Sequence, residues 1–401
     1  MRKSWRLPVA LVTAVVVAQA AVIVMRPRDR GPEPVPVEPR AYFSQEQIDR
    51  ADDFRGPQRW IFLAQTAIGL GVLVLFVRRP PRRLTDLRRP LVAGAATAAA
   101  ISVAGLVAHV PLGLVARERA KDVGLVTQDL AGYASDLLKT GAIGAAIAGA
   151  GGALFVLGLR KLGNRWWLAG AVVVVAYGAI TTYASPVVLD PLFNDFKKLP
   201  QGQLRSDVLE LAERAGVDAG EVYEIDASRR TTAANAYVAG VGHTKRVVIY
   251  DNLIKEFTPE ETRLVVAHEL GHAHYHDLRN GLIWVAIVAV PGMWALAELT
   301  RRLGGDASAG ARAVPAVALG IAIVVPVTAM IANQLYRQVE ARADAFSLEL
   351  TDEPETFIGF QKRIALQNVG DVDPPAAYQF VFGTHPTTMQ RIGMGEAFEE
   401  R

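Results

Sequence analysis

Long apolar stretches constrain this chain more than any other feature. Hydrophobic residues make up 51% of the 401 residues and charged residues only 21%. An α-helix needs about 20 consecutive apolar residues to cross a bilayer. Seven stretches approach or exceed that length, at residues 8–25, 60–77, 91–116, 140–159, 166–183, 281–299 and 314–335. The sequence therefore predicts a mainly α-helical membrane bundle of about seven spans.

The spans divide the chain into two predicted regions. We expect residues 1–184 to form an N-terminal membrane region that contains the first five spans. We expect residues 185–401 to fold as one unit that the last two spans interrupt, because only this membrane hairpin separates its two polar parts. The first polar part has β-like runs and turn glycines, which predict a small sheet. These runs lie at residues 221–225, 234–238 and 246–250.

The charges predict both the environment and the orientation of the chain. The net charge is +3, and arginines cluster beside the apolar stretches, as in proteins that face anionic lipid. This pattern gives no support for nucleic-acid binding. Basic loops at residues 78–89, 160–165 and 301–302 favour the cytoplasmic side. We expect a multi-pass protein of the plasma membrane, with residues 185–280 and the C-terminus outside.

Residues 268–272 read His-Glu-Leu-Gly-His, within a predicted helix that Thr258, Pro259 and Glu261 begin. Two histidines four residues apart lie on nearly the same helix face and can bind one zinc ion. Glu269 can take a proton from the attacking water and pass it to a leaving amine. The motif therefore predicts zinc-dependent hydrolysis of peptide bonds.

A catalytic zinc ion needs a third protein ligand. The chain has no cysteine, so the ligand must be a histidine or a carboxylate. Glu340 is the best candidate, and Asp344 lies one turn further along the same predicted helix. We expect Asp344 to accept a hydrogen bond from the distal nitrogen of a ligand histidine.

Other histidines and one carboxylate compete for these roles. His276 extends the face of the metal helix, but it lies too far along a straight helix from an ion held by His268. We interpret His274 and His276 as residues of the helix end, and Asp277 as a group that orients its neighbours. His109 lies inside the third apolar stretch, where an ionisable group is a functional candidate, and its role stays open.

Together these blocks resemble the type I CAAX prenyl proteases, which are seven-span membrane zinc metalloendopeptidases. The resemblance covers most of the chain, because the span count and the position of the metal motif between the fifth and sixth spans also fit. The matching blocks lie in the expected order, at residues 191–194, 235–237, 245–251, 268–272, 340–346, 384–386 and 391–392.

The resemblance implies a role for each matched residue of the metal centre. His268, His272 and Glu340 would bind one zinc ion, and Glu269 would act as the general base. His385 would stabilise the oxyanion of the tetrahedral intermediate.

The resemblance also implies a substrate and the residues that hold it. Arg391 would support the region around the oxyanion. Asn235 would bind the substrate backbone from an edge strand that aligns the peptide. The substrate would be a peptide or protein, lipidated or not, with C-terminal processing of CAAX-type proteins as the family's activity.

Two alternatives remain at the level of sequence. The first is a general membrane quality-control metalloprotease with no preference for prenyl groups. The second is a membrane scaffold whose zinc ion only braces the fold. Glu269 argues against the scaffold, because a structural zinc site has no use for an unliganded base beside the metal.

Overall fold

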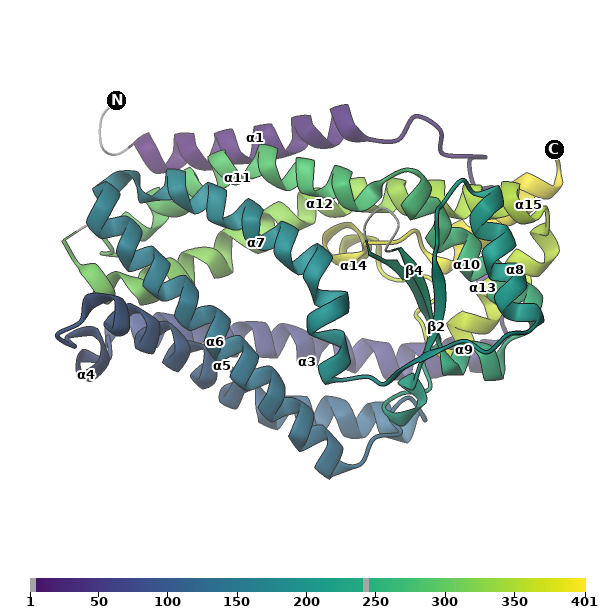
Figure 1. The fold of residues 1–401 in the computed structure, drawn as a ribbon, viewed down its shortest axis with the longest axis horizontal. Coiled ribbons are helices and arrows are strands. Elements are labelled where there is room, and N and C mark those ends of the chain that lie inside the picture. The colour runs from purple at the N-terminus through teal and green to yellow at the C-terminus, as the bar shows by residue number, and fades with distance from the viewer. Residues whose placement is uncertain (1–4, 241–244, 307) are drawn as a thin grey trace.

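Long helices form one part of the molecule, and a compact unit with a small sheet lies at one end of them (Figure 1). This computed structural model describes residues 5–240, 245–306 and 308–401. The long helices are α1 (Arg6–Met25), α3 (Gln45–Arg78), α5 (Pro90–Asp122), α6 (Leu130–Leu162), α7 (Trp166–Val188), α11 (Asp277–Arg302) and α12 (Val314–Thr351).

Each of the seven predicted apolar stretches lies within one of these helices. By length and composition, six continuous helical segments of the described chain can cross a membrane. One of the six, Leu130–Val188, contains both α6 and α7, which the 3-10 turn Gly163–Arg165 joins. Large apolar side chains face outward from the bundle, such as Val107, Val172 and Ile180, each more than 60% exposed. The chain is therefore a multi-pass membrane protein.

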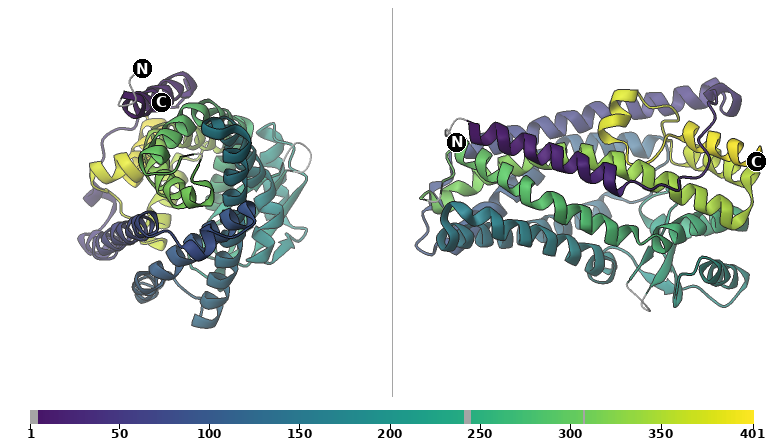
Figure 2. Two further views of the ribbon diagram at one scale, coloured as in Figure 1. Left: turned by 90° about the vertical axis from the view of Figure 1, so that its left-hand side faces the viewer. Right: turned by 90° about the horizontal axis from the view of Figure 1, so that it is seen from above.

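Buried contacts between helices come largely from small side chains. Ala18 and Val22 of α1 pack in one buried cluster with Trp284 of α11 and Ile331 of α12. In the view along the long axis, α1 lies at the outside of the bundle (Figure 2). Lipid tails are as apolar as the helix surfaces, so the hydrophobic effect does not drive membrane helices together. Close packing of small residues stabilises such contacts instead.

The second span begins earlier than the sequence predicts. Ser44 caps α3 through a capping box with Gln47, and the helix then continues past Pro57 without a break. The sequence of residues 43–50 predicts only a short surface helix with Ser44 as its cap, separate from the apolar span. Side-chain contacts hold the extension in place, because Arg55 donates to the carbonyls of Val369 at 2.6 Å and of Asn368 at 2.5 Å.

The compact unit contains a four-stranded sheet in the order β1-β2-β4-β3. The β1–β2 and β3–β4 pairs are antiparallel, and β2 pairs with β4 in parallel. The prediction missed β1, whose three residues show no apolar alternation. Gly240 has φ of +103°, and Gly242, which was expected to complete the same turn, lies outside the described residues. The strands are β1 (Phe196–Lys198), β2 (Glu221–Ile225), β3 (Ala236–Ala239) and β4 (Arg246–Tyr250).

Shorter helices surround the sheet and complete the unit. One buried cluster joins Val222 and Val247 of the sheet with Leu264 and Leu270 of α10 and with Leu348 of α12. Burial of each such side chain contributes roughly 1.5–3 kcal/mol. The core therefore fixes α10 between the sheet and the end of α12. The shorter helices are α2 (Pro39–Tyr42), α8 (Gln203–Arg214), α9 (Asp251–Glu256), α10 (Pro259–His274), α13 (Pro354–Gln367), α14 (Ala376–Phe382) and α15 (Thr388–Glu399), while α4 (Arg82–Thr85) lies at the opposite end of the bundle (Figure 1).

Candidate active site

Helix α10 begins as its sequence predicts. The Thr258 hydroxyl accepts a hydrogen bond from the Glu261 amide at 3.2 Å, and the Glu261 carboxylate accepts one from the Thr258 amide at 2.8 Å. Leu264 and Leu270 are fully buried in the core. The capped start and the buried leucines fix the rotation of α10, so the histidine pair of the motif meets α12.

Three side chains from α10 and α12 bring their ligand atoms together. His268 Nε2 lies 3.2 Å from His272 Nε2 and 3.2 Å from Glu340 Oε2. His272 Nε2 lies 3.5 Å from Glu340 Oε1. Within the described part of the chain, these three residues are a group whose ligand atoms all lie within 4.8 Å of one another. Two imidazole nitrogens and a carboxylate are the donors of a catalytic zinc site.

The Glu340 carboxylate shows that these residues suit a metal ion. Its Oε2 atom is buried, and the Nε2 atoms of His268 and His385, each 3.2 Å away, do not make a well-aligned hydrogen bond with it. A buried acceptor without a partner is costly, and coordination of a cation removes that cost. The donor set and this oxygen together fit a bound metal ion.

A buried carboxylate orients the first histidine. His268 Nδ1 donates to Asp344 Oδ1 at 2.9 Å, and Asp344 has no solvent exposure. Arg391 Nε donates to the second oxygen, Asp344 Oδ2, at 2.8 Å. The hydrogen bond at Nδ1 leaves Nε2 free to face the metal position.

A second carboxylate orients the other histidine in the same way. His272 Nδ1 donates to Asp277 Oδ2 at 3.0 Å. Arg342 donates to Asp277 Oδ1 and lies over the Tyr275 ring, 4.0 Å from its centroid. From the sequence we expect Asp277 only to orient its neighbours, without a named partner.

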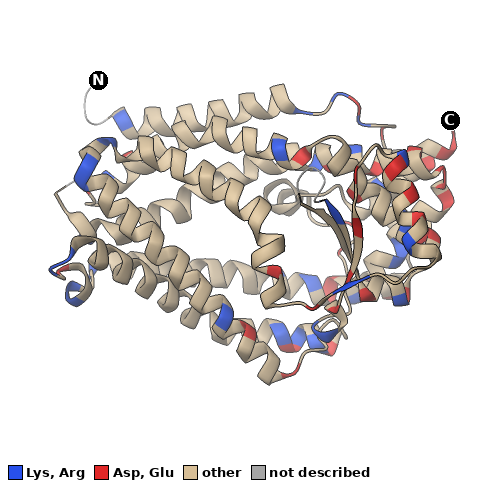
Figure 3. Ribbon diagram, viewed as in Figure 1, with Lys and Arg blue, Asp and Glu red and all other residues tan. Residues whose placement is uncertain are grey.

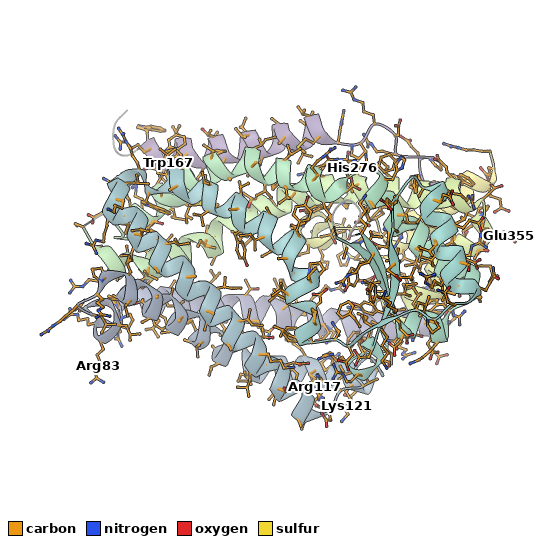
Figure 4. All side chains as sticks on the ribbon, viewed as in Figure 1. Arg83, Arg117, Lys121, Trp167, His276 and Glu355 are labelled. Carbon is orange, nitrogen blue, oxygen red and sulfur yellow. The ribbon has the colours of Figure 1, made fainter. Side chains whose placement is uncertain are left out.

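The helix end explains how Asp277 reaches the site and why its neighbours do not. His276 has φ of +58°, a left-handed conformation that ends α10 and lets α11 begin at Asp277. His274 Nδ1 donates to the carbonyl of Ala215 at 2.7 Å, and His276 Nδ1 contacts the carbonyl of Ala273 at 3.0 Å. Figure 4 shows His276 where α11 begins. Neither histidine belongs to the metal group.

Glu269 and His385 both lie close to the metal group. Burial raises the pKa of Glu269, whose nearest charged neighbours include His268 and His272. His385 Nε2 lies 3.2 Å from Glu340 Oε2, and its side chain is 57% exposed. An exposed ring that also touches a metal ligand can meet both solvent and substrate.

The predicted substrate-binding residues lie in different surroundings. Asn235 precedes β3, at the edge of the sheet, and its side-chain oxygen accepts from the Ala236 amide at 2.9 Å. The Arg391 side chain is 19% exposed and lies against Asp344. Its observed contact is therefore with the group that orients His268.

His109 has a partner within the bundle. Its Nε2 atom lies 2.9 Å from the carbonyl of Gln65 on α3. A Cβ atom on Gly69 would lie 3.1 Å from the same ring nitrogen. The histidine therefore joins two membrane helices and is not part of the metal group.

Comparisons with known proteins agree with this geometry. A family model described as "Peptidase family M48" matches residues 198–396 of this chain. The chain is 28% identical over 297 residues to the uncharacterized metalloprotease YhfN of Bacillus subtilis (strain 168), covering 72% of this chain and 70% of that protein. It is 27% identical over 268 residues to the probable CAAX prenyl protease 1 of Schizosaccharomyces pombe, covering 65% of this chain but only 56% of that protein.

The fold has a counterpart among solved structures. The crystal structure of S. mikatae Ste24p superposes with a TM-score of 0.73, covers 99% of both chains, and shares 17% sequence identity. At that identity the likeness establishes the fold alone. Residues 198–396 match peptidase family M48, and together with the ligand geometry and the membrane-spanning helices this match identifies the chain as a membrane metallopeptidase, a hydrolase that acts on peptide bonds.

Proposed function

We propose that this chain is a zinc metalloendopeptidase in which Glu269 is the general base and His385 stabilises the oxyanion. The observation that carries the proposal is the convergence of two oriented histidines and a carboxylate beside an unliganded glutamate. His268, His272 and Glu340 would hold the ion. Zinc supplies a Lewis acid there, which polarises a carbonyl group and acidifies a water molecule.

In this mechanism Glu269 moves the proton. It takes one proton from the water that attacks the scissile carbonyl and delivers it to the leaving amine. Burial raises the pKa of its carboxyl group, which makes the carboxylate a stronger base and the resulting acid a usable proton donor.

His385 acts on the charge that develops at the carbonyl oxygen. Its Nδ1 lies 2.8 Å from the Thr384 hydroxyl. A neutral ring that accepts a hydrogen bond at Nδ1 carries its own hydrogen on Nε2, the atom near Glu340. That N–H is the donor we assign to the oxyanion.

Strand β3 supports the assignment of the substrate position. It is the edge strand of the sheet, and it packs beside α10. An extended peptide can add to such an edge through main-chain hydrogen bonds. These bonds recognise the peptide backbone and do not depend on the identity of its side chains. Asn235, at the start of β3, would bind the peptide backbone there.

For the substrate, our first hypothesis is C-terminal processing of CAAX-type proteins, with the lipid as part of what is recognised. The named activity of the fission yeast relative supports it. The second is a general membrane protease without prenyl preference. It is favoured by the bacterial relative, which is described only as a metalloprotease and is matched over a larger share of its length.

We further propose that the zinc site faces away from the cytoplasm, in the plasma membrane. Lys and Arg gather at the end of the bundle opposite the sheet, with few acidic residues among them (Figure 3). Arg83 and Trp167 lie at this basic end, and Glu355 lies at the other (Figure 4). The positive-inside rule favours a cytoplasmic position for the basic end.

Cleavage of a prenylated C-terminal peptide beside its unprenylated twin tests the substrate. The purified zinc-loaded protein would be used, with Glu269→Gln as the blank. Cleavage of the prenylated peptide alone would support the CAAX hypothesis, and equal cleavage of both would support the general protease. If neither the pair nor an unfolded protein such as casein were cleaved by protein that holds zinc, the proposed mechanism would be wrong.

A further inference from the structure

A polar stripe along α12 connects the metal site with the loop that carries His385. Asn333, Arg337, Glu340 and Asp344 follow one another at helical spacing and therefore lie along one face of the helix. Glu340 and Asp344 belong to the metal site. The other two residues of the stripe have no role in the site as described so far.

Both of those residues bind the C-terminal end of α14. Arg337 donates from one guanidinium nitrogen to the carbonyl of Gln379 at 3.2 Å and to that of Gly383 at 2.6 Å. Asn333 donates to the carbonyl of Val381 at 2.7 Å. The last carbonyls of a helix are short of donors within that helix, and side chains of α12 add donors at this end of α14.

The end of α14 in turn fixes the backbone of His385. The Gln379 side chain donates to the carbonyl of His385 at 2.7 Å. The amide of Gly383 donates to the carbonyl of Gln379 at 3.0 Å. A Cβ atom on Gly383 would lie 2.6 Å from the carbonyl oxygen of Gln379, so this close approach of backbone favours glycine.

We propose that Arg337 is a positioning residue for His385. It lies three residues before Glu340 on one rigid helix, so the same element sets both the metal ligand and the cap that holds the His385 loop. The result is the 3.2 Å approach of His385 Nε2 to Glu340 Oε2. This inference rests on the proposed role of His385, and it adds the reason why that ring is in place before substrate binds.

The guanidinium group is suited to this role. Its N–H groups project in a fixed planar fork, so two carbonyls about one helical turn apart can be held together. Lysine has a compact ammonium group on a flexible stem and fixes geometry less well. Arg337→Met should therefore lose the positioning, and Arg337→Lys should retain it in part.

The test is a double-mutant cycle on the full-length, zinc-loaded protein in detergent. Arg337→Met, His385→Ala and the double variant would be compared for kcat and KM on a quenched fluorescent peptide. Arg263→Gln serves as the matched control, because Arg263 lies on α10 but only approaches Glu353, at 3.9 Å. Zinc content and the Kd of a phosphinic peptide, which carries a tetrahedral oxyanion, provide readouts beside activity.

We expect Arg337→Met to lower kcat by about 10- to 100-fold, with KM and zinc content nearly unchanged. The phosphinic peptide should bind more weakly by a similar factor. In the His385→Ala background the same substitution should change kcat by less than about twofold, because its effect passes through the missing ring. Arg337→Lys should lie between the wild type and Arg337→Met.

Equal losses from Arg337→Met in both backgrounds would overturn the positioning role and leave the proposed function intact. Loss of zinc in Arg337→Met would also overturn it, because the residue would then support the metal site itself. If His385→Ala kept wild-type kcat, the role of His385 would fall, and the positioning role of Arg337 with it.

Discussion

At the scale of single residues, two chains of hydrogen bonds, each from a histidine through a carboxylate to an arginine, hold the metal ligands in place. One runs from His268 through Asp344 to Arg391, and the other joins His272, Asp277 and Arg342. In each chain the carboxylate orients the imidazole ring and the arginine holds the carboxylate in place. Both histidines therefore present Nε2 to the same point.

Removal of Asp277 should weaken metal binding while leaving the fold in place. We expect Asp277→Ala to lower zinc affinity by about 10- to 100-fold, because His272 loses its orienting acceptor. Competition with a chromophoric chelator measures the change. Asp207→Ala is the matched control, since Asp207 lies on α8 and accepts a hydrogen bond from the Gln203 side chain at 2.6 Å. An unchanged affinity in Asp277→Ala would show that the second chain does not support the site.

Zinc binding should release protons. Burial opposes protonation of both histidines, but in the metal-free protein hydrogen bonds with Asp344 and Glu340 raise the pKa of His268 to about 9. Hydrogen bonds with Asp277 and Glu340 raise the pKa of His272 to about 10. Because the two Nε2 atoms lie 3.2 Å apart and share a hydrogen bond, the pair holds at least one extra proton at pH 7, and both rings must be neutral to bind metal.

We expect about one proton or more to be released per zinc ion at pH 7, and the apparent affinity to rise as pH increases from 7 towards 9. Calorimetry in buffers of different ionisation enthalpy measures the release. An enthalpy independent of the buffer, with an affinity that does not change with pH, would contradict the protonation state derived from these contacts.

Sequence reasoning could identify the ligands because their spacing is local. His268, Glu269 and His272 form one helical motif, and Asp344 lies one turn from Glu340. The contact of Asp277 depends on the left-handed conformation of His276, which no helix pattern predicts. Arg342 reaches Asp277 from a separate helix, and only the packing of α11 against α12 brings them together.

At the scale of secondary-structure elements, α5 and α6 come so close that their backbones touch. A Cβ atom on Gly94 would lie 2.6 Å from the carbonyl oxygen of Gly152, and one on Gly152 would collide with the backbone of Gly94. Small residues allow this approach, and only glycine fits where two backbones meet. The adjacent Gly151 faces open space.

Gly152→Leu should therefore destabilise the bundle, whereas Gly151→Leu should not. Overpacking at such a contact costs about 1–3 kcal/mol. A loss of that size corresponds to a fall in Tm of roughly several degrees, measured by thermal unfolding in detergent. Equal Tm values for the two variants would mean that α5 and α6 do not pack as described.

The elements differ in how far the sequence determines them. The membrane helices can be identified from the length of their apolar stretches, because each helix is longer than the stretch of sequence needed to recognise it. Strand β1 has only three residues, Phe196–Lys198, and exists because β2 lies beside it. The start of α3 was correctly assigned to the Ser44 cap, but its continuation past Pro57 depends on contacts with distant residues such as Val369.

Orientation in the membrane can be tested at the scale of the whole molecule. The chain has no cysteine, so single cysteines can be introduced without background. Arg83 lies at the basic end and Glu355 at the end that carries the sheet, and both are exposed (Figure 4). We expect a membrane-impermeant maleimide to label Glu355→Cys in intact cells and Arg83→Cys only after lysis. The reverse pattern would place the metal site in the cytoplasm.

The central claim is that Glu269 transfers the proton at a metal site built by His268, His272 and Glu340. Glu269→Gln keeps the size and polarity of the side chain but removes its basicity. The most direct test is to measure zinc content and kcat of this variant together. We predict stoichiometric zinc and a loss of kcat of at least about 100-fold. Wild-type kcat in a variant that holds zinc would contradict the account.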